Sequence, residues 1–170
     1  EITYSTPGTY TYTVTESGSL DGVTNDDTAT KTVSVVVSDN TDGTMSATVN
    51  VGNGAVIFTN TYNAASVDVP IPVKKTLSVL SGNNAPNVEG QYTFTLKDAN
   101  SATVGTVTSG TSGTAVNFDP ITYTAPGTYT YTITETGTLA GVTNDAAAST
   151  GETVTVHVAD NGTGQLVATI

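Results

Sequence analysis

Apolar and polar residues alternate along most of this chain, which is the period of a β-strand with one buried face. Clusters of Gly, Asn, Asp and Ser separate the alternating stretches, as turns separate strands. No stretch sustains the 3.6-residue period of an amphipathic helix. The pattern predicts an all-β protein with strands in VKKTLSVL (73–80), QYTFTLKD (91–98), TAVNFDPI (114–121), GTYTYTITE (127–135), ETVTVHVAD (152–160), GQLVATI (164–170) and AVIFTNTY (55–62).

The alternating stretches belong to an internal repeat. ITYSTPGTYTYTVTESGSLDGVTND (2–26) is nearly repeated as ITYTAPGTYTYTITETGTLAGVTND (121–145), and after a short insertion near Ser149 the match continues between residues 31–49 and 152–170. The repeating unit is about 120 residues long, which fits one β-sandwich module of a tandem array.

The repeat predicts where the modules meet. Residues 1–62 form the C-terminal half of one module, and residues 63–72 form a junction stiffened by Pro70 and Pro72. Residues 73–170 form the N-terminal part of the next module, without the last strand that would correspond to residues 55–62.

Three strands each place one polar residue on an apolar face. Lys75 shares its face with Ile71, Val73, Leu77 and Val79, whereas Lys74 points the other way. Asn60 shares a face with Val56, Phe58 and Tyr62. Glu135 continues the face of Tyr129, Tyr131 and Ile133, and Glu16 takes the same place in the earlier copy.

These three residue types can react with one another. Burial favours the neutral forms of an amine and a carboxylic acid. A neutral lysine amine is a nucleophile, an asparagine amide carbon is an electrophile, and a protonated glutamic acid can transfer protons. Together they predict a Lys–Asn isopeptide bond formed with release of ammonia. Each residue also has another interpretation. Lys74 could be the inward lysine in place of Lys75. Glu135 could reach solvent at a strand end, and Asn60 could be a cap or turn residue.

Composition excludes several other functions. Four lysines and no arginine stand against 15 acidic residues, giving a net charge of −11, which disfavours binding to nucleic acid or to an anionic membrane. There is no cysteine, and the single histidine, His157, provides no catalytic triad. DNTDG (39–43) fits a hairpin turn better than a calcium loop, and the repeated Asp26 and Asp145 fit turn residues. We therefore expect no metal and no cofactor.

VKKTL, GQYTFTLKDA, VNFDPITYTAPGTYTYTITE and FTNTY, taken in order, resemble the isopeptide-linked pilin and adhesin repeats of Gram-positive bacteria. The resemblance implies immunoglobulin-like β-sandwich modules in tandem, each with a first-strand Lys bonded to a last-strand Asn. By this resemblance Lys75 is the amine, Asn60 is the amide of the preceding module, and Glu135 and Glu16 are the catalytic acids. Neither partial module contains all three groups, so a bond could form only if the FTNTY strand of a neighbouring chain, or residues 51–62 folding back, fills the gap beside Lys75.

The expected function is structural. The chain would be a repeat of a pilus or adhesin stalk, extracellular on the cell surface and anchored to the cell wall through a part outside this segment. Its partners would be neighbouring modules of the same fibre, strand-swapped or covalently linked copies included. Cross-linking would be a single turnover and not enzymatic. The alternatives are a ligand-binding β-sandwich adhesin domain and, last, a glycosidase-like hydrolase, which needs two carboxylates facing each other across a cleft.

Overall fold

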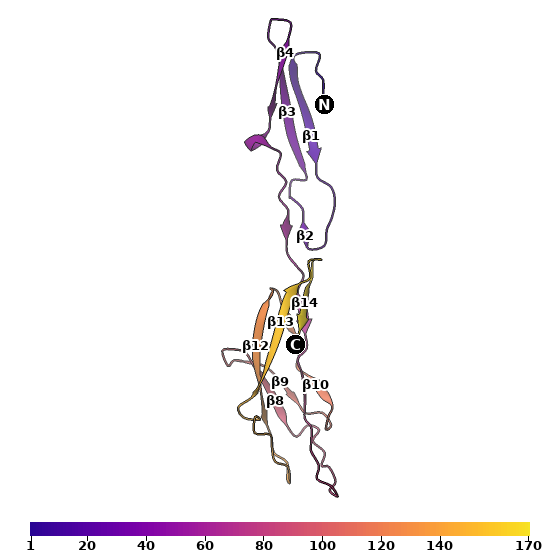
Figure 1. Ribbon diagram of the computed structural model, residues 1–170, viewed down its shortest axis with the longest axis vertical. Helices are drawn as coiled ribbons and strands as arrows, with labels where there is room; N and C mark the ends of the chain where they lie inside the picture. Colours follow the sequence, from indigo (N-terminus) through magenta and orange to yellow (C-terminus); the bar gives the residue numbers. More distant parts are fainter. The chain divides into compact units, whose positions relative to one another are not determined.

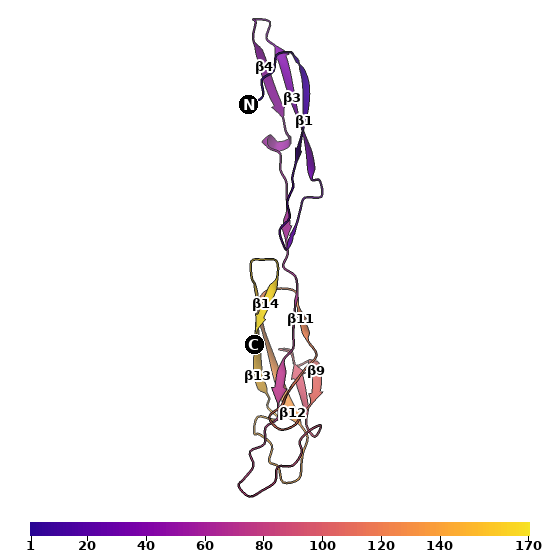
Figure 2. The same cartoon turned by 90° about the vertical axis from the view of Figure 1, so that its right-hand side faces the viewer.

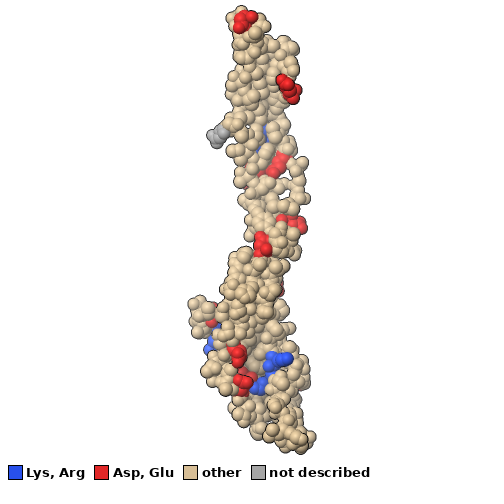
Figure 3. All heavy atoms as spheres, viewed as in Figure 1, with Lys and Arg blue, Asp and Glu red and all other residues tan. Residues whose placement is uncertain are grey.

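The computed structural model describes residues 1–170, except for the side chain of Asn53. The chain forms two compact units, unit 1 (Glu1–Asn63) and unit 2 (Ala64–Ile170). Apart from one 3-10 turn, η1 (Gly52–Gly54), the regular structure in the described residues is β-strand. The predicted all-β fold is therefore confirmed. The surface seen in Figure 3 is mostly uncharged, as a chain with 11% charged residues would be.

Unit 1 contains one three-stranded antiparallel sheet and one short strand pair. The sheet has the order β1-β3-β4, with β1 at Gly8–Thr15, β3 at Thr30–Asp39 and β4 at Met45–Asn50 (Figure 1). The short pair joins β2 (Val23–Thr24) to β5 (Thr61–Tyr62). Val35 and Val37 of β3 are the buried apolar residues of this unit, so its core is small.

Unit 2 is built on a five-stranded antiparallel sheet. Its order is β14-β13-β12-β8-β9, in which β12, β13 and β14 lie side by side in Figures 1 and 2. The strands are β8 (Thr93–Lys97), β9 (Thr103–Thr108), β12 (Gly127–Thr136), β13 (Glu152–Asp160) and β14 (Leu166–Thr169). Two short antiparallel pairs complete the unit: β6 (Val67–Val69) with β11 (Ile121–Tyr123), and β7 (Pro72–Lys74) with β10 (Ala115–Asn117).

The core of unit 2 lies between the large sheet and the two short pairs. The short pairs and the segments beside them provide Val69, Ile71, Phe118 and Tyr123, and the large sheet provides Phe94, Leu96, Tyr131, Ile133, Val156, Val158 and Leu166. These residues alternate with less buried ones along the strands, because successive side chains point to opposite faces. Two layers that share one apolar interior make a β-sandwich, in agreement with the predicted fold class.

The repeated sequences form the same sheet in both units. In β1 and β3, Tyr10 lies opposite Val35, and in β12 and β13 the equivalent Tyr129 lies opposite Val156. The register of the next pair also matches, with Val37 opposite Ala47 in unit 1 and Val158 opposite Ala168 in unit 2. The inserted residues lie in the connection between strands, so they do not disturb the pairing.

Two segments differ from the sequence-based description. Residues 63–72, described above as a junction, include β6 and contribute Val69 and Ile71 to the core of unit 2. The predicted strand 73–80 has ladder pairing only as far as Lys74, because its partner β10 begins at Ala115, opposite that residue. Beyond it Val79 and Leu80 are exposed, at 42% and 77%.

Candidate functional site

Lys75 lies immediately after β7 and points into the sandwich. The alternation of buried and exposed residues continues past the end of the strand, so Ile71 and Lys75 are buried while Lys74 is exposed. Its backbone remains anchored, since the Gly113 N–H donates to the Lys75 carbonyl at 2.7 Å. Of the two neighbouring lysines, Lys75 is therefore the one that enters the interior.

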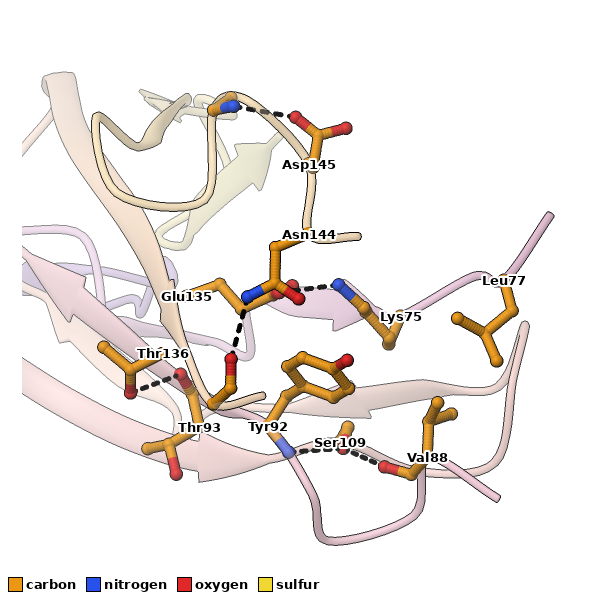
Figure 4. A network of polar contacts seen from close by, with 12 residues as sticks. Lys75, Leu77, Val88, Tyr92, Thr93, Ser109, Glu135, Thr136, Asn144 and Asp145 are labelled. Carbon is orange, nitrogen blue, oxygen red and sulfur yellow. Dashed lines mark hydrogen bonds and ion pairs between the residues drawn. The ribbon is translucent and has the colours of Figure 1, made fainter. Parts of the chain in front are cut away.

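Glu135 meets Lys75 inside unit 2. It lies on β12 opposite Phe94 of β8, on the inward face that follows Tyr131 and Ile133. Its Oε1 is 2.6 Å from Lys75 Nζ, and the two side chains are only 10% and 8% exposed. Water is thus largely excluded from the pair, and its charges are screened much less than those of a surface ion pair. Figure 4 shows this contact.

Tyr92 and Asn144 complete the surroundings of the pair. Lys75 Nζ lies 4.2 Å from the centroid of the buried Tyr92 ring, where the face of the ring attracts a cation. Asn144 Nδ2 donates to the Gly137 carbonyl at 2.8 Å. The Tyr92 hydroxyl and Asn144 Oδ1 are buried and have no hydrogen-bond partner among the described residues. Both side chains lie beside the Lys75–Glu135 contact in Figure 4. Unsatisfied polar atoms at one buried spot are unusual in a structural core and are more typical of a functional site.

Unit 1 contains a complementary arrangement around the equivalent glutamate. Asn60 Nδ2 donates to Glu16 Oε1 at 2.7 Å, and the backbone N–H of Asp26 donates to Asn60 Oδ1 at 2.9 Å. The second carboxylate oxygen of Glu16 is buried and has no partner among the described residues. Asn60 lies next to β5, which pairs with β2 through Val23 and Thr24. The glutamate therefore binds an amide in unit 1 and an amine in unit 2.

A groove in unit 2 lies where the Asn60 strand lies in unit 1. Val142 and Thr143 are the repeat equivalents of the β2 residues that pair with β5. They line a groove of about 730 Å³ together with Lys75, Asn144 and Asp145. The groove thus joins an unpaired backbone segment to the buried amine. An added strand fits such a place because it can form ladder hydrogen bonds along one edge.

The structure brings the predicted site residues together in two pairs, Lys75 with Glu135 and Glu16 with Asn60. Asn60, expected on a buried face, is exposed, and so is Tyr62 at 47%. The reason is that the described part of unit 1 has no layer equivalent to β7 and β8 to cover this face.

Sequence reasoning missed Tyr92, Asn144 and the hydrogen bond from the Asp26 backbone N–H to Asn60. A signal was present for the last two. Asn25 and Asp26 recur as Asn144 and Asp145, and Asn25 donates to the Gly18 carbonyl just as Asn144 donates to that of Gly137. No comparable signal identified Tyr92, since the matched part of the repeat does not include it.

Other candidate sites take ordinary structural roles. His157 is exposed on β13, within 3.1 Å of the Thr128 hydroxyl. In the β3–β4 hairpin, Asp39 and Asp42 accept hydrogen bonds from backbone N–H groups of Thr41 and Thr44. Among the described residues, no group of His, Cys, Asp or Glu side chains is arranged to hold a metal ion. Nor do they include a helix long and apolar enough to cross a membrane.

Comparison with known protein families gives a match over most of the chain. The sequence profile described as FctA, a Spy0128-like isopeptide containing domain, matches residues 1–63 and 71–170. The match covers both units and both glutamates, and it confirms the resemblance to isopeptide-linked pilin repeats. No curated protein matches the chain.

Proposed function

Because the chain belongs to the FctA family of Spy0128-like isopeptide-containing domains, a pilin-type structural family of the cell surface, we propose how its residues form the cross-link. Lys75 is the amine, an asparagine in the setting of Asn60 is the amide, and Glu135 or Glu16 transfers the protons. The product is a structural module of a pilus or adhesin stalk, stabilised by an autocatalytic Lys–Asn bond.

One observation carries this proposal: two glutamates at equivalent positions of the repeat bind the two different reactants. Glu135 Oε1 binds Lys75 Nζ at 2.6 Å, and Glu16 Oε1 binds Asn60 Nδ2 at 2.7 Å. A carboxylate has two oxygens, and the second oxygen of Glu16 is buried without a partner among the described residues. One glutamate can therefore hold an amine and an amide at once, which places the nucleophile beside the electrophile.

The contacts support the following path for each atom. A proton passes from Lys75 Nζ to Glu135 across the 2.6 Å contact, which leaves a neutral amine and a protonated acid. The nitrogen lone pair attacks the amide carbon of the asparagine, and the carbonyl π electrons move onto its oxygen. When the tetrahedral intermediate collapses, the amide nitrogen takes the proton that Glu135 held and leaves as ammonia, while the attacking nitrogen gives its second proton to the Glu135 carboxylate. A C–N bond replaces a C–N bond, and no oxidant is needed.

The interior of unit 2 favours this reaction in two ways. Exclusion of water makes charged forms costly, so a neutral amine beside a neutral acid becomes accessible. Fixing both reactants in one place removes most of the entropic cost of a bimolecular reaction, and effective concentrations in such arrangements reach about 10⁵–10⁸ M. The Tyr92 ring, which packs over Lys75 Nζ, keeps the amine on the side of Glu135. Each site reacts once, so the chain is not an enzyme.

The cross-link suits a surface stalk. It joins a segment near the start of a module to the last strand, so a pulling force on the module would pass through a covalent bond. By analogy with a disulfide that closes a loop of about 100 residues, it would add roughly 4–5 kcal/mol of stability. The chain has no cysteine, and an isopeptide bond cannot be reduced. We infer that its partners are neighbouring modules of one fibre, held to the cell wall through another part of the protein.

The experiment adds a second copy of the Asn60 strand after residue 170. A chain of residues 1–170 followed by a second copy of residues 50–63 is purified, and its intact mass is measured. We expect a mass lower by one ammonia, and tandem mass spectrometry should join Lys75 to the copied asparagine. Lys75→Ala and Glu135→Ala should restore the full mass, whereas Lys74→Ala, at the exposed neighbour, should not. Full mass in the unsubstituted extended chain would overturn the proposal.

A further inference from the structure

The amide of Asn60 is held at both ends in unit 1. Glu16 accepts from its nitrogen, and the backbone N–H of Asp26 donates to its oxygen at 2.9 Å. The amide oxygen is the atom on which negative charge develops when an amine attacks the carbon. A fixed backbone donor at that atom is the arrangement that stabilises the oxyanion in acyl-transfer reactions.

The carboxylate of Asp26 holds the strand that carries this amide. Its Oδ2 accepts from the backbone N–H of Thr59, the residue before Asn60, at 2.9 Å. Its Oδ1 accepts from Lys31 Nζ at 2.9 Å and from the Thr28 backbone N–H at 2.8 Å. The hydrogen bond from Lys31, followed by those from Thr59 and Thr28, lowers the pKa of Asp26 to about 2. Asp26 thus stays an acceptor throughout the ordinary pH range.

We propose that Asp26 and its repeat equivalent Asp145 serve the cross-linking reaction in two ways. The backbone N–H is the donor that stabilises the oxyanion of the tetrahedral intermediate. The carboxylate is a positioning group, which sets the asparagine strand in register by accepting the N–H of the residue before the asparagine. This inference rests on the proposed function, and it assigns to this aspartate more than the role of a turn residue.

The same loop is built in unit 2 around Asp145. Asp145 Oδ1 accepts from the Ala147 backbone N–H at 2.8 Å, as Asp26 Oδ1 does from Thr28. Asn144 Nδ2 binds the Gly137 carbonyl at 2.8 Å, as Asn25 binds Gly18 at 2.7 Å. Among the described residues of unit 2 no strand equivalent to β5 occupies the site, yet the loop has the same hydrogen bonds. The donor is therefore in place before the amide arrives, and preorganisation of this kind is what makes an oxyanion donor effective.

Asp145 also lies close to the reacting pair, where its backbone N–H can meet the oxygen of an incoming amide. It lines a groove of about 440 Å³ with Lys75 and Glu135, and in Figure 4 it follows Asn144 directly above them. An asparagine in this groove would have its nitrogen toward Glu135 and its oxygen toward the Asp145 N–H, as Asn60 has toward Glu16 and Asp26. Lys75 Nζ then faces the amide carbon, and the electrons displaced by its attack move onto an oxygen that already has a donor.

The first test uses Asp145→Asn in the extended chain described above. Asparagine can keep the turn, because its carbonyl oxygen still accepts from Ala147, but its NH₂ group then faces a strand N–H that needs an acceptor. Cross-linking is followed by pulse-chase in cell-free translation, where the cyclised chain migrates faster on a denaturing gel. We expect Asp145→Asn to slow cross-linking at least about tenfold.

The matched control is Asp98→Asn. Asp98 makes a similar turn in the β8–β9 hairpin by accepting from the N–H groups of Asn100 and Ala102, so this variant should react at the unsubstituted rate. Folding is checked by thermal unfolding of both variants in a Lys75→Ala background, where no bond forms. Slow reaction with an unchanged melting temperature shows positioning. An unchanged rate for Asp145→Asn overturns the positioning role.

The role of the Asp145 backbone N–H as a donor is tested in the same translation system, with a suppressor tRNA that carries malic acid. Malic acid at position 145 keeps the carboxylate and replaces only the backbone N–H by an ester oxygen. Loss of one such donor should slow the reaction about tenfold to a thousandfold. An unchanged rate overturns the donor role while leaving the proposed function intact, because the unsubstituted chain still loses ammonia.

A last measurement does not depend on the reaction. In the chain of residues 1–170, hydrogen exchange of the Asp26 amide should be slow, and Asn60→Ala should accelerate it, since that variant removes the acceptor at 2.9 Å. Unprotected exchange of Asp26 in the unsubstituted chain would overturn the inference.

Discussion

The buried contact between Lys75 and Glu135 allows a quantitative prediction about unit 2. The two charged atoms are 2.6 Å apart, and the side chains are 8% and 10% exposed, so water can replace neither partner. Removing one member leaves the other in the interior without its counter-charge, which costs about 3–5 kcal/mol. We therefore expect Lys75→Met and Glu135→Met each to destabilise unit 2 by this amount. Lys75→Met also loses the contact with the Tyr92 ring.

The double variant should recover most of this loss. When both members are replaced by apolar side chains of similar length, no unpaired charge remains, and such replacements are often neutral. A near-neutral double variant, set against two single losses of about 3–5 kcal/mol each, corresponds to a coupling energy of about 6–10 kcal/mol in the double-mutant cycle. Lys74→Met provides the control: its side chain is exposed, so its effect should stay within about 0.5 kcal/mol.

The assay must observe unit 2 separately from unit 1. Urea unfolding of the chain of residues 1–170 can be followed by the methyl NMR signals of Val156, which is fully buried in unit 2. If the effects of the two single substitutions simply add, with a coupling energy below about 0.5 kcal/mol, the pair is hydrated. That result would refute the argument that the amine and the acid meet in a dry interior.

Three other perturbations test the fold around the site. Ile71→Ala should cost unit 2 about 2–5 kcal/mol by the same assay, because it leaves a cavity at a fully buried residue on the same face as Lys75. Gly137→Ala should cost clearly more than Gly141→Ala: both residues have positive φ, but a Cβ at Gly137 would lie 2.5 Å from the Gln91 carbonyl oxygen, whereas none at Gly141 meets an atom within 4 Å. Asp26 has its pKa lowered from 3.8 to about 2, so its contribution to the stability of unit 1 should be complete above pH 3.8 and disappear as the pH falls through about 2. Acid unfolding of unit 1, followed by NMR with Asp26→Asn as reference, should show this window, and a contribution that persists below it would contradict the assignment.

The sites at Glu16 and at Glu135 show what a periodic sequence pattern can predict and what it cannot. The period of two predicts which side chains share a face, so the alternation groups Lys75, Glu135 and Glu16 with apolar neighbours, although it leaves Lys74 as an alternative to Lys75. The pattern does not determine whether that face is buried. Asn60 follows the same alternation as Lys75, yet it is exposed while Lys75 is buried, because only unit 2 has, among the described residues, a second layer over the corresponding face.

Hydrogen-bonded strands also proved shorter than the alternating sequence. Residues 73–80 alternate throughout, but ladder pairing ends at Lys74, where the partner strand β10 begins. Conversely, a segment with two prolines described as a junction carries Ile71 into the core. A strand needs a partner as well as a pattern, and proline prevents pairing only where its missing N–H would be used.

The β-class of this protein, its repeat, and the residue types that could react all follow from the order of its amino acids, because side-chain alternation and self-similarity are properties of a linear chain. Three further features depend on the folded molecule: which lysine lies inside, that Tyr92 packs over it, and that a backbone N–H of Asp26 binds the amide oxygen of Asn60. Those contacts join residues far apart in sequence, and their distances depend on how strands and loops pack together. The local sequence pattern determines which face of a strand a side chain occupies, whereas its reactivity depends on which residues of other strands and loops lie against that face.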